Sequence, residues 1–483
     1  MNDRNRKPQA LEHSLQSVLR TKSRTRREGL AVLAAGTSAQ HPLRNDLVPK
    51  LDLVERAPQD LIAPARNVRA INAPHLREVA NAISCLGFCD PVLIDDQNNV
   101  LDGVVRVEAA KLLGLTRISC IRTNHLDAAE RRLVRMALNR LGEKGTWNFD
   151  ELKLELEDLI LEEAPIKISG FSMTEIDQII MGDEVAAVET GPLAPESDAK
   201  PIARVGDVFA LGNHRVVCGD STDPHVLEII MADDNARLIL TDEPYNVPIA
   251  GHVTSGGHRE FFMASGEMSN AEFKVFNAAW IGASLHHLCD GGLFATFIDW
   301  RGYPIVNSVA LQLGFTPMNL IVWSKNNAGM GSLYRSQHEL LPLFKKGKAA
   351  HTNNVELGKN GRWRSNLWTY PGASSMGSEA RKGLQDHPTV KPTVMLEDAL
   401  LDITERGEIV LDPFLGSGST LIAAEKTGRR CRGVEIDPLY VDVILRRYES
   451  VTGRQGTLEG TGETIVELAV RRNGDVTGHP INV

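Results

Sequence analysis

The second half of the chain alternates short apolar runs with segments whose apolar residues recur every three or four positions. The runs predict buried strands and the recurrent spacing predicts amphipathic helices. Strands are expected at 207–211, 214–220, 236–240, 292–300, 320–325, 338–345, 409–412 and 431–437, and helices from 393 and from 420. Strands and helices that follow one another in this way are typical of an α/β fold.

Residues 48–182 carry the same two patterns on a smaller scale. The spacing predicts a helix over 73–86, which Gly87 ends. A strand, a polar turn and a second strand are expected over 91–103. The remaining expected elements are a helix at 104–114, a strand at 118–122 and helices at 127–141 and 149–163. Together they predict a separate, small α/β domain.

Three stretches show neither pattern. Residues 1–47 have few large apolar side chains, so we expect them to be disordered. Residues 183–203 gather Gly, Pro, Ala and acidic residues without a period, and are interpreted as a linker. Residues 453–483 are polar and are interpreted as a C-terminal tail. The larger predicted domain therefore spans 204–452.

The 483-residue chain has a formal net charge of −9, which is unusual for a protein that binds nucleic acid over its whole surface. Residues 1–50 nevertheless hold ten Lys or Arg against four Asp or Glu, with the densest run at 20–27. This leader is interpreted either as a phosphate-binding arm or as a solvated segment. No apolar run approaches twenty residues and the polar start shows no signal peptide, so we expect a cytoplasmic protein without membrane contact.

Six cysteines are scattered along the chain, at 85, 89, 120, 218, 289 and 431. Cys85 and Cys89 are close together, but no second pair of Cys or His completes a metal-binding set. We therefore expect buried, reduced thiols and no metal.

The segment 409–424 carries the first candidate chemistry. An apolar strand ends at Asp412, glycines follow at 416 and 418, and a helix begins at 420. Such a turn lets backbone approach a nucleotide-like ligand, although the same spacing also serves plain packing. The next predicted strand leads to Glu435, where a carboxylate could bind a ribose diol.

This segment resembles the S-adenosylmethionine-binding motif of DNA methyltransferases that modify exocyclic amino groups. Asp412, Phe414, Gly416 and Gly418 stand at the matching positions. The resemblance implies that the phenylalanine packs on the cofactor, that the glycines line its methionine part and that Glu435 binds its ribose. It also implies a Rossmann-like, S-adenosylmethionine-dependent methyltransferase domain.

Two further stretches fit the same family. His387-Pro-Thr-Val-Lys-Pro matches its His-Pro-x-x-Lys-Pro signature, which implies that His387, Thr389 and Lys391 surround the methionine end of the cofactor. Asp220 follows a predicted strand, where the family places an acid near the adenine; a structural turn is the alternative. The order of the motifs is that of the β class of amino methyltransferases.

The predicted strand at 236–240 leads to Asp242-Glu243-Pro244-Tyr245, where the family has Asp-Pro-Pro-Tyr. The amino group of a base is a poor nucleophile, because its lone pair is delocalised into the ring. Hydrogen bonds from its N–H groups to the Asp242 carboxylate and the carbonyl of residue 243 would favour a nucleophilic form. Tyr245 would stack on the flipped-out base.

Glu243 departs from the family pattern. Its carbonyl survives the change, and Pro244 still biases residue 243 towards an extended conformation. The fixed φ of a proline is lost and a carboxylate is added, which could favour a cationic product or repel the carboxylate of the cofactor. Reduced or absent activity is one open outcome.

The 48–182 domain resembles the ParB/sulfiredoxin-like family through Gly103-Val-Val-Arg106 followed by Ala109-Ala110. The resemblance implies a helix N-terminus and an arginine that could hold a phosphate. The preferred interpretation is a recognition or dimerisation module without chemistry, because one arginine stands where the most active members have two.

Residues 346–386 are basic and glycine-rich, and they contain Trp363, Arg364, Trp368 and Tyr370. Basic and aromatic residues interleaved in this way suit a segment that reads a DNA groove. An ordinary surface insertion is the alternative.

These patterns predict a ParB-like module joined to a DNA methyltransferase that acts on double-stranded DNA. The reaction would move a methyl group from S-adenosylmethionine to the exocyclic amino group of adenine in a flipped-out base, with cytosine as the less favoured interpretation of the target. Two alternatives stay open: a DNA-binding protein with a weakened site, and an enzyme that methylates RNA or protein glutamine. The sequence leaves the target site and a homodimer open.

Overall fold

The computed structural model describes residues 49–66, 70–142, 144–181, 194–195, 199–246, 266–326, 333–358, 362–370 and 391–474. The chain forms two compact units, Met1–Thr146 and Trp147–Val483. The leader expected at 1–47 and most of the linker expected at 183–203 lie outside the described residues.

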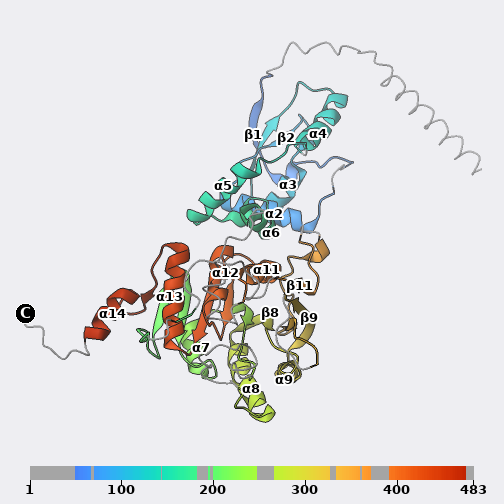
Figure 1. The fold of residues 1–483 in the computed structure, drawn as a ribbon. Coiled ribbons are helices and arrows are strands. Elements are labelled where there is room, and N and C mark those ends of the chain that lie inside the picture. The colour runs from blue at the N-terminus through green and yellow to red at the C-terminus, as the bar shows by residue number, and fades with distance from the viewer. Residues whose placement is uncertain are drawn as a thin grey trace, which may run out of the picture. The chain divides into compact units, whose positions relative to one another are not determined.

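The smaller unit is a four-stranded sheet in the order β1-β4-β2-β3, with helices packed against it (Figure 1). Its elements are β1 (Asp52–Arg56), α2 (Ala73–Leu86), β2 (Val92–Ile94), β3 (Val100–Asp102), α3 (Val104–Leu112), β4 (Ile118–Arg122) and α4 (Ala128–Gly142). All but β1 match the elements expected from the sequence. Val92, Ile94 and Val107 belong to the core that joins sheet and helices.

The larger unit is built on a ten-stranded sheet in the order β11-β9-β10-β8-β7-β12-β13-β6-β5-β14. Its strands are β5 (Val208–Leu211), β6 (His214–Cys218), β7 (Ala236–Thr241), β8 (Leu288–Thr296), β9 (Thr316–Ser324), β10 (His338–Lys345), β11 (Leu367–Thr369), β12 (Ile409–Asp412), β13 (Arg430–Glu435) and β14 (Thr457–Leu458). The five central strands, β8, β7, β12, β13 and β6, are mutually parallel. The expected α/β fold with a largely parallel core is confirmed.

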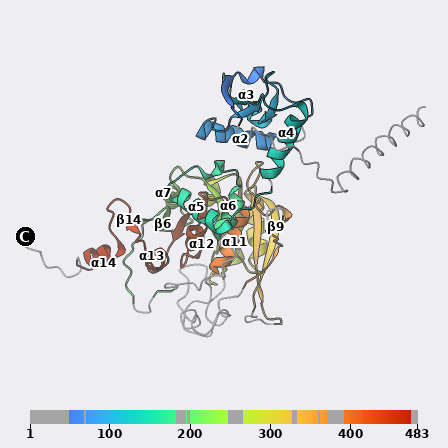
Figure 2. The ribbon, with the colours of Figure 1, turned by 90° about the horizontal axis from the view of Figure 1, so that it is seen from above.

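Helices cover both faces of this sheet, as Figures 1 and 2 show from two directions. The described helices of this unit are α5 (Phe149–Leu161), α6 (Met173–Met181), α7 (Pro224–Met231), α8 (Asn270–His286), α9 (Tyr303–Gln312), α11 (Thr393–Ile403), α12 (Ser419–Thr427), α13 (Pro438–Thr452) and α14 (Ile465–Gly474). One hydrophobic cluster joins α11, α12 and α13 to the sheet. A second cluster joins α7, α8 and α9 to the opposite face.

Both expected boundaries of the methyltransferase domain differ from the observed ones. The chain divides between Thr146 and Trp147 rather than at 182, so α5 and α6 belong to the larger unit. At the other end, β14 pairs with β5, and Leu468 of α14 is fully buried in the main core. Residues 457–474 therefore extend the domain instead of forming a tail.

A buried ion pair holds α6 within the larger unit. Asp177 Oδ2 lies 2.8 Å from Arg429 Nη1, and Asp177 Oδ1 lies 3.0 Å from Arg406 Nη2. The Arg429 side chain is 0% exposed and that of Asp177 is 4% exposed. Arg429 also donates to the carbonyl and hydroxyl oxygens of Thr404, just after α11, and to the carbonyl of Thr427 at the end of α12.

None of the described helices is long and apolar enough to cross a membrane.

Cys120, Cys218 and Cys431 are buried as expected, and all six cysteines are free thiols. Cys85 and Cys89 are exposed, because they lie on and just after the last turn of α2, so the expectation of burial is wrong for this pair.

We predict that Asp177→Asn destabilises the full chain by about 3 kcal/mol, because removing one partner leaves the other charge buried. Urea unfolding measures this loss. The matched control is Glu405→Gln, which removes the partner of the exposed Lys167 at 2.8 Å; it should cost about 1 kcal/mol or less. Equal losses in the two variants would contradict the structural role of the buried pair.

Candidate functional site

Four neighbouring parallel strands bring the predicted site residues to one edge of the sheet. Their order is β7-β12-β13-β6, with Leu411 paired to Ile239 and Glu435 paired to Cys218. Parallel strands end at the same edge, which is where α/β sheets bind ligands. The residues that follow or end these strands are Asp242, Glu243, Pro244 and Tyr245 after β7, Asp412, Phe414, Gly416 and Gly418 at the end of β12 and after it, Glu435 on β13 and Asp220 after β6.

The glycine turn after β12 leaves open space beside its backbone. Gly416 and Gly418 have φ of 56° and 84°, in the region that favours glycine. A Cβ added to Gly416 would meet no atom within 4 Å, whereas one added to Gly418 would lie 3.2 Å from Ile444. Gly416 therefore borders a space that a ligand could fill, and Gly418 is required for packing.

Two buried carboxylates border this turn. Glu435 Oε2 accepts a hydrogen bond from Gly416 N–H at 2.8 Å, and Asp412 Oδ1 accepts one from the Thr241 hydroxyl at 2.6 Å. Burial raises the pKa of Glu435 to about 7 and that of Asp412 to about 6, against these hydrogen bonds. Each carboxylate keeps unused lone pairs. They could therefore accept further hydrogen bonds from a ligand in the open space beside Gly416.

Phe414 and Asp220 make contacts of their own. The Phe414 ring is half-buried and packs edge-on against Trp280, with centroids 5.2 Å apart. Asp220 Oδ1 accepts hydrogen bonds from the N–H and the hydroxyl of Thr222, both at 2.8 Å. This geometry is that of a structural turn, which is the alternative role for Asp220. The turn uses Oδ1 of the carboxylate and not Oδ2.

Asp242 lies within a compact polar network. Its Oδ1 accepts a hydrogen bond from the Tyr245 hydroxyl at 2.8 Å, and its Oδ2 lies 2.5 Å from Lys391 Nζ. The Tyr245 hydroxyl is also 3.0 Å from Glu339 Oε2, and Lys391 Nζ is 3.2 Å from the same oxygen. Lys391 thus contacts the carboxylate after β7, a contact that its expected role near the cofactor did not include.

Sequence reasoning missed Glu339, which lies on β10. Its neighbours in the chain form an ordinary apolar strand, and nothing in their spacing marks this carboxylate. The antiparallel pairing of β10 with β9, which sets Glu339 opposite Trp323, and the bridge from Leu340 to Ile298 bring it to the network. Burial opposes its ionisation, but Lys391 and Lys325 outweigh burial and lower its pKa to about 2.

Glu243 is buried without a polar partner. Its side chain is 1% exposed, and neither carboxylate oxygen has a hydrogen-bond partner in the part of the chain that the structure describes. Burial, with the nearby Asp242 and Asp412 charges, raises its pKa well above the usual range despite Lys391. Burial therefore favours the neutral form of the added carboxyl group.

Parts of the expected site lie outside the described residues, namely His387 and Thr389. Residues 247–265 are also outside them. Asn246, just before residues 247–265, is hydrogen-bonded to Met268, just after them. The Asn246 amide donates to the Met268 carbonyl at 2.6 Å and accepts from the Met268 N–H at 3.1 Å.

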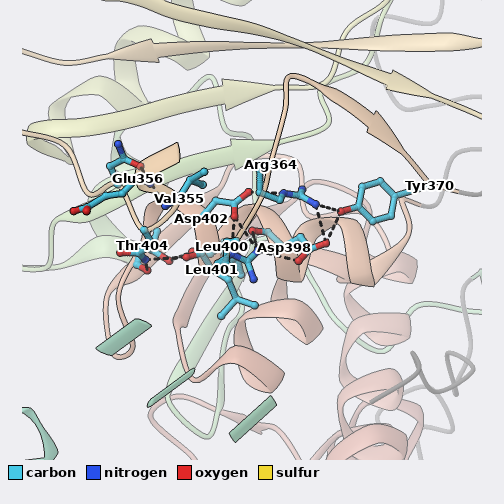
Figure 3. A network of polar contacts seen from close by, with 12 residues as sticks. Val355, Glu356, Arg364, Tyr370, Asp398, Leu400, Leu401, Asp402 and Thr404 are labelled. Atoms are coloured by element: carbon cyan, nitrogen blue, oxygen red, sulfur yellow. Dashed lines mark hydrogen bonds and ion pairs between the residues drawn. The ribbon is translucent and has the colours of Figure 1, made fainter. Parts of the chain in front are cut away.

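The candidate recognition segment uses part of its polar groups internally (Figure 3). Arg364 donates to Asp402 Oδ2 at 3.0 Å and to the Tyr370 hydroxyl at 2.7 Å, and it lies 3.2 Å from Asp398 Oδ2. Trp368 is buried. Trp363 is 83% exposed, so among these four residues it alone presents a wide surface to solvent.

Arg106 in the smaller unit is likewise paired. It forms ion pairs with Asp90 and, at 2.7 Å, with Asp102. Its guanidinium packs over Gly103, where an added Cβ would lie 2.8 Å from Arg106 Nε. A phosphate would have to compete with two carboxylates for this side chain. Among the residues that the structure describes, no group of three or more His, Cys, Asp or Glu could hold a metal ion.

We predict that Glu243→Gln removes a pH-dependent loss of stability. A carboxyl whose pKa is raised by folding keeps its proton where the unfolded chain releases it, so the natural protein loses stability as pH rises above about 4.5. Urea unfolding at pH 5 and pH 8 should show the variant gaining on the natural protein as pH rises. Glu228→Gln, at an exposed carboxylate, is the control. Parallel curves for Glu243→Gln and the natural protein would contradict the prediction.

Comparison with known proteins places this site in a family. The N6/N4 DNA methylase profile matches residues 236–446. The Type II methyltransferase M2.DpnII of Streptococcus pneumoniae is 30% identical over 232 residues, which are 46% of this chain and 85% of that protein.

Two solved structures were also compared. The PvuII DNA methyltransferase, described as cytosine-N4-specific, is 15% identical with a TM-score of 0.39, over 58% of this chain and 97% of that one. A C-terminally truncated chromosome-partitioning protein ParB of Caulobacter crescentus is 19% identical with a TM-score of 0.24, over 27% of this chain and 77% of that one. The extent of the match to the pneumococcal protein carries the assignment: the chain belongs to the N6/N4 DNA methylase family of S-adenosylmethionine-dependent DNA methyltransferases.

Proposed function

We propose that the chain methylates the exocyclic amino group of adenine, with cytosine as the alternative target, in a base turned out of double-stranded DNA. The observation that carries the proposal is the position of Asp242 at the end of β7, directly beside β12 with its glycine turn. A carboxylate and an open glycine turn at one sheet edge would bring an amino group and a methyl donor together.

Asp242 would accept a hydrogen bond from the target amino group. A carboxylate has about four lone-pair sites, and Tyr245 and Lys391 use one each. The carbonyl of residue 243 would accept the second N–H, since it does not depend on the side chain present. Both acceptors increase electron density on the nitrogen as positive charge develops there.

The glycine turn and Glu435 would hold S-adenosylmethionine, which supplies an activated methyl group when bound. Gly416 offers the open space, and Glu435 offers an acceptor for ribose hydroxyls. Lys391 and, in the same signature, His387 and Thr389 would lie towards the methionine end. Phe414 would contribute the ring face that Trp280 leaves free.

We infer that the smaller unit is a ParB-like recognition or dimerisation module without chemistry. The pairing of Arg106 with Asp90 and Asp102 supports this, because the one arginine of the signature is already neutralised. We also propose that the protein is cytoplasmic and that it can form a homodimer. A fragment that separates the larger unit from the smaller one should begin near Trp147 and keep α5 and α6.

We predict that Gly416→Val lowers S-adenosylmethionine affinity at least tenfold in calorimetry. The new side chain would occupy the open space, and a β-branched residue at φ of 56° would also distort the turn. Gly407→Val is the matched control, since Gly407 has φ of 81° with no atom within 4 Å of an added Cβ, just before the start of β12. Equal affinity in Gly416→Val and the natural protein would refute the assignment.

We predict that Asp242→Asn lowers the single-turnover rate of methyl transfer to DNA about a hundredfold or more, with cofactor affinity largely retained. Tritiated methyl incorporation measures the rate, and product analysis identifies methyladenine or methylcytosine. RNA and protein offered in competition with DNA test the other substrate classes. If the natural protein binds DNA but transfers no methyl group to any of them, it is a binding protein with a weakened site.

A further inference from the structure

Four charged side chains form an alternating chain that ends at Asp242. Lys325, just after β9, pairs with Glu339 on β10, and Glu339 Oε2 lies 3.2 Å from Lys391 Nζ. Lys391, two residues before α11, in turn lies 2.5 Å from Asp242 Oδ2. The strands β9, β10 and β7 and the start of α11 each position one member, so the tertiary fold assembles the chain.

The middle of this chain is shielded from water. The Lys391 side chain is 7% exposed and that of Glu339 is 14% exposed. Lys391 Nζ also lies 5.1 Å from the ring centroid of Phe297, 5.6 Å from that of Tyr245 and 5.9 Å from that of Trp323. Aromatic faces attract a cation, and charges act more strongly on one another where water is excluded.

The contacts of Asp242 also fix the direction of its carboxylate. Lys391 holds one oxygen and the Tyr245 hydroxyl holds the other. Glu339 Oε2 lies 3.0 Å from the same hydroxyl and 3.2 Å from Lys391 Nζ. The single proton of the hydroxyl can serve only one of the two carboxylates at a time, so Glu339 orients Lys391 in the first place. A carboxylate held at two points presents its remaining lone pairs in a fixed direction.

We propose that Lys391 is a positioning residue that keeps Asp242 ionised and oriented for the target amino group, and that Glu339 holds Lys391 in place. This inference rests on the proposed function, because it assumes that Asp242 accepts the hydrogen bond from the substrate. It assigns Lys391 a role beyond cofactor binding, and it gives Glu339 a role for the first time.

Lys391 and Glu339 have opposite effects on the pKa of Asp242, and these effects can be tested separately. Burial raises the pKa of Asp242, and Lys391 counteracts this rise, whereas Glu339 adds to it. Burial alone would lower the pKa of Lys391, but Asp242 and Glu339 raise it, so its charge persists. The titratable groups that face Asp242 are Glu243, Tyr245, Glu339, Lys391 and Asp412.

The test is the pH dependence of the single-turnover rate at saturating S-adenosylmethionine and DNA. An opposite charge at this distance shifts a carboxyl pKa by about 1–3 units. We therefore expect Lys391→Met to move the acid limb of the profile to higher pH by about 1 unit or more, with rate recovered in alkaline buffer. Glu339→Gln keeps an amide oxygen that can accept a hydrogen bond from Lys391, so Lys391 should stay in place. The variant should therefore move the limb the other way, because it removes only a neighbouring negative charge.

Matched variants separate this effect from a loss of structure. Lys391→Arg keeps the charge and should leave the acid limb in its natural position. Glu397→Gln on α11 removes the 2.8 Å partner of Lys426, an ion pair outside the network, and should also leave the limb unmoved. Cofactor affinity and the urea midpoint are measured for each variant.

Two outcomes would overturn the inference: a Lys391→Met profile lowered equally at every pH, or a Glu339→Gln limb that moves upwards or not at all. If Lys391→Met does not fold, the inference is still decided by a downward shift of the limb in Glu339→Gln and by an unmoved limb in Lys391→Arg. Asp242→Asn separates the two proposals. If Asp242→Asn is active, the proposed function is refuted. If Asp242→Asn is inactive and the acid limb of Lys391→Met does not move, only the positioning role of Lys391 and Glu339 is refuted.

Discussion

The parallel register of β7, β12, β13 and β6 is the constraint on which the rest of the site depends. Strands that run side by side in one direction must end at one edge, whatever the separation of their residues in the sequence. Thr241 and Asp412 are 171 residues apart in the chain, yet their side chains are hydrogen-bonded, directly beside Asp242. The glycine turn, the carboxylates of Asp412 and Glu435 and the segment 242–245 thus lie at one edge of the sheet, although not every one of these groups contacts every other.

The edge gathers several buried ionisable groups. Asp412, Glu435 and Glu243 all have pKa values raised by burial, and Lys391 and Arg447 are buried cations at the same edge. Carboxyl groups buried in this way cost folding free energy, and perturbed pKa values of this kind cluster at functional sites. The ten-stranded sheet and its two hydrophobic clusters offset that cost.

The sequence predicts most of the strands and the helices of the smaller unit, but it sets no bounds for α6, α7, α8, α9, α13 and α14 and predicts the assembled contacts poorly. The strands at β7, β10 and β12 have long apolar runs, and the helix α2 has clean spacing, so their periods are readable. The exposed β1 and the two-residue β14 have no such pattern, because pairing with a neighbouring strand defines them. Their presence depends on partners far away in the chain.

The same limit applies to the site. Asp242, Asp412 and Glu435 are marked by local sequence, since each follows or ends an apolar strand. Glu339 and the contact between Lys391 and Asp242 carry no local mark, because strand order and helix placement create them. Arg364 and Tyr370 are the opposite case, because the sequence marked them for a role that their contacts do not require. The basic and aromatic composition of their segment suggested DNA contact, but Asp402 and Asp398 of α11 bind them (Figure 3).

The seating of α6 has a consequence for how the chain responds to cleavage. Asp177 binds Arg429 and Arg406 from within the larger unit, so a cut between Met181 and Ala199 would leave α5 and α6 attached to it without a covalent link. Before the cut, the helices act as an intramolecular ligand whose local concentration is set by the connecting segment. After it, their retention would depend on affinity alone. Electrophoresis under denaturing conditions would then show two fragments, while gel filtration would show one particle.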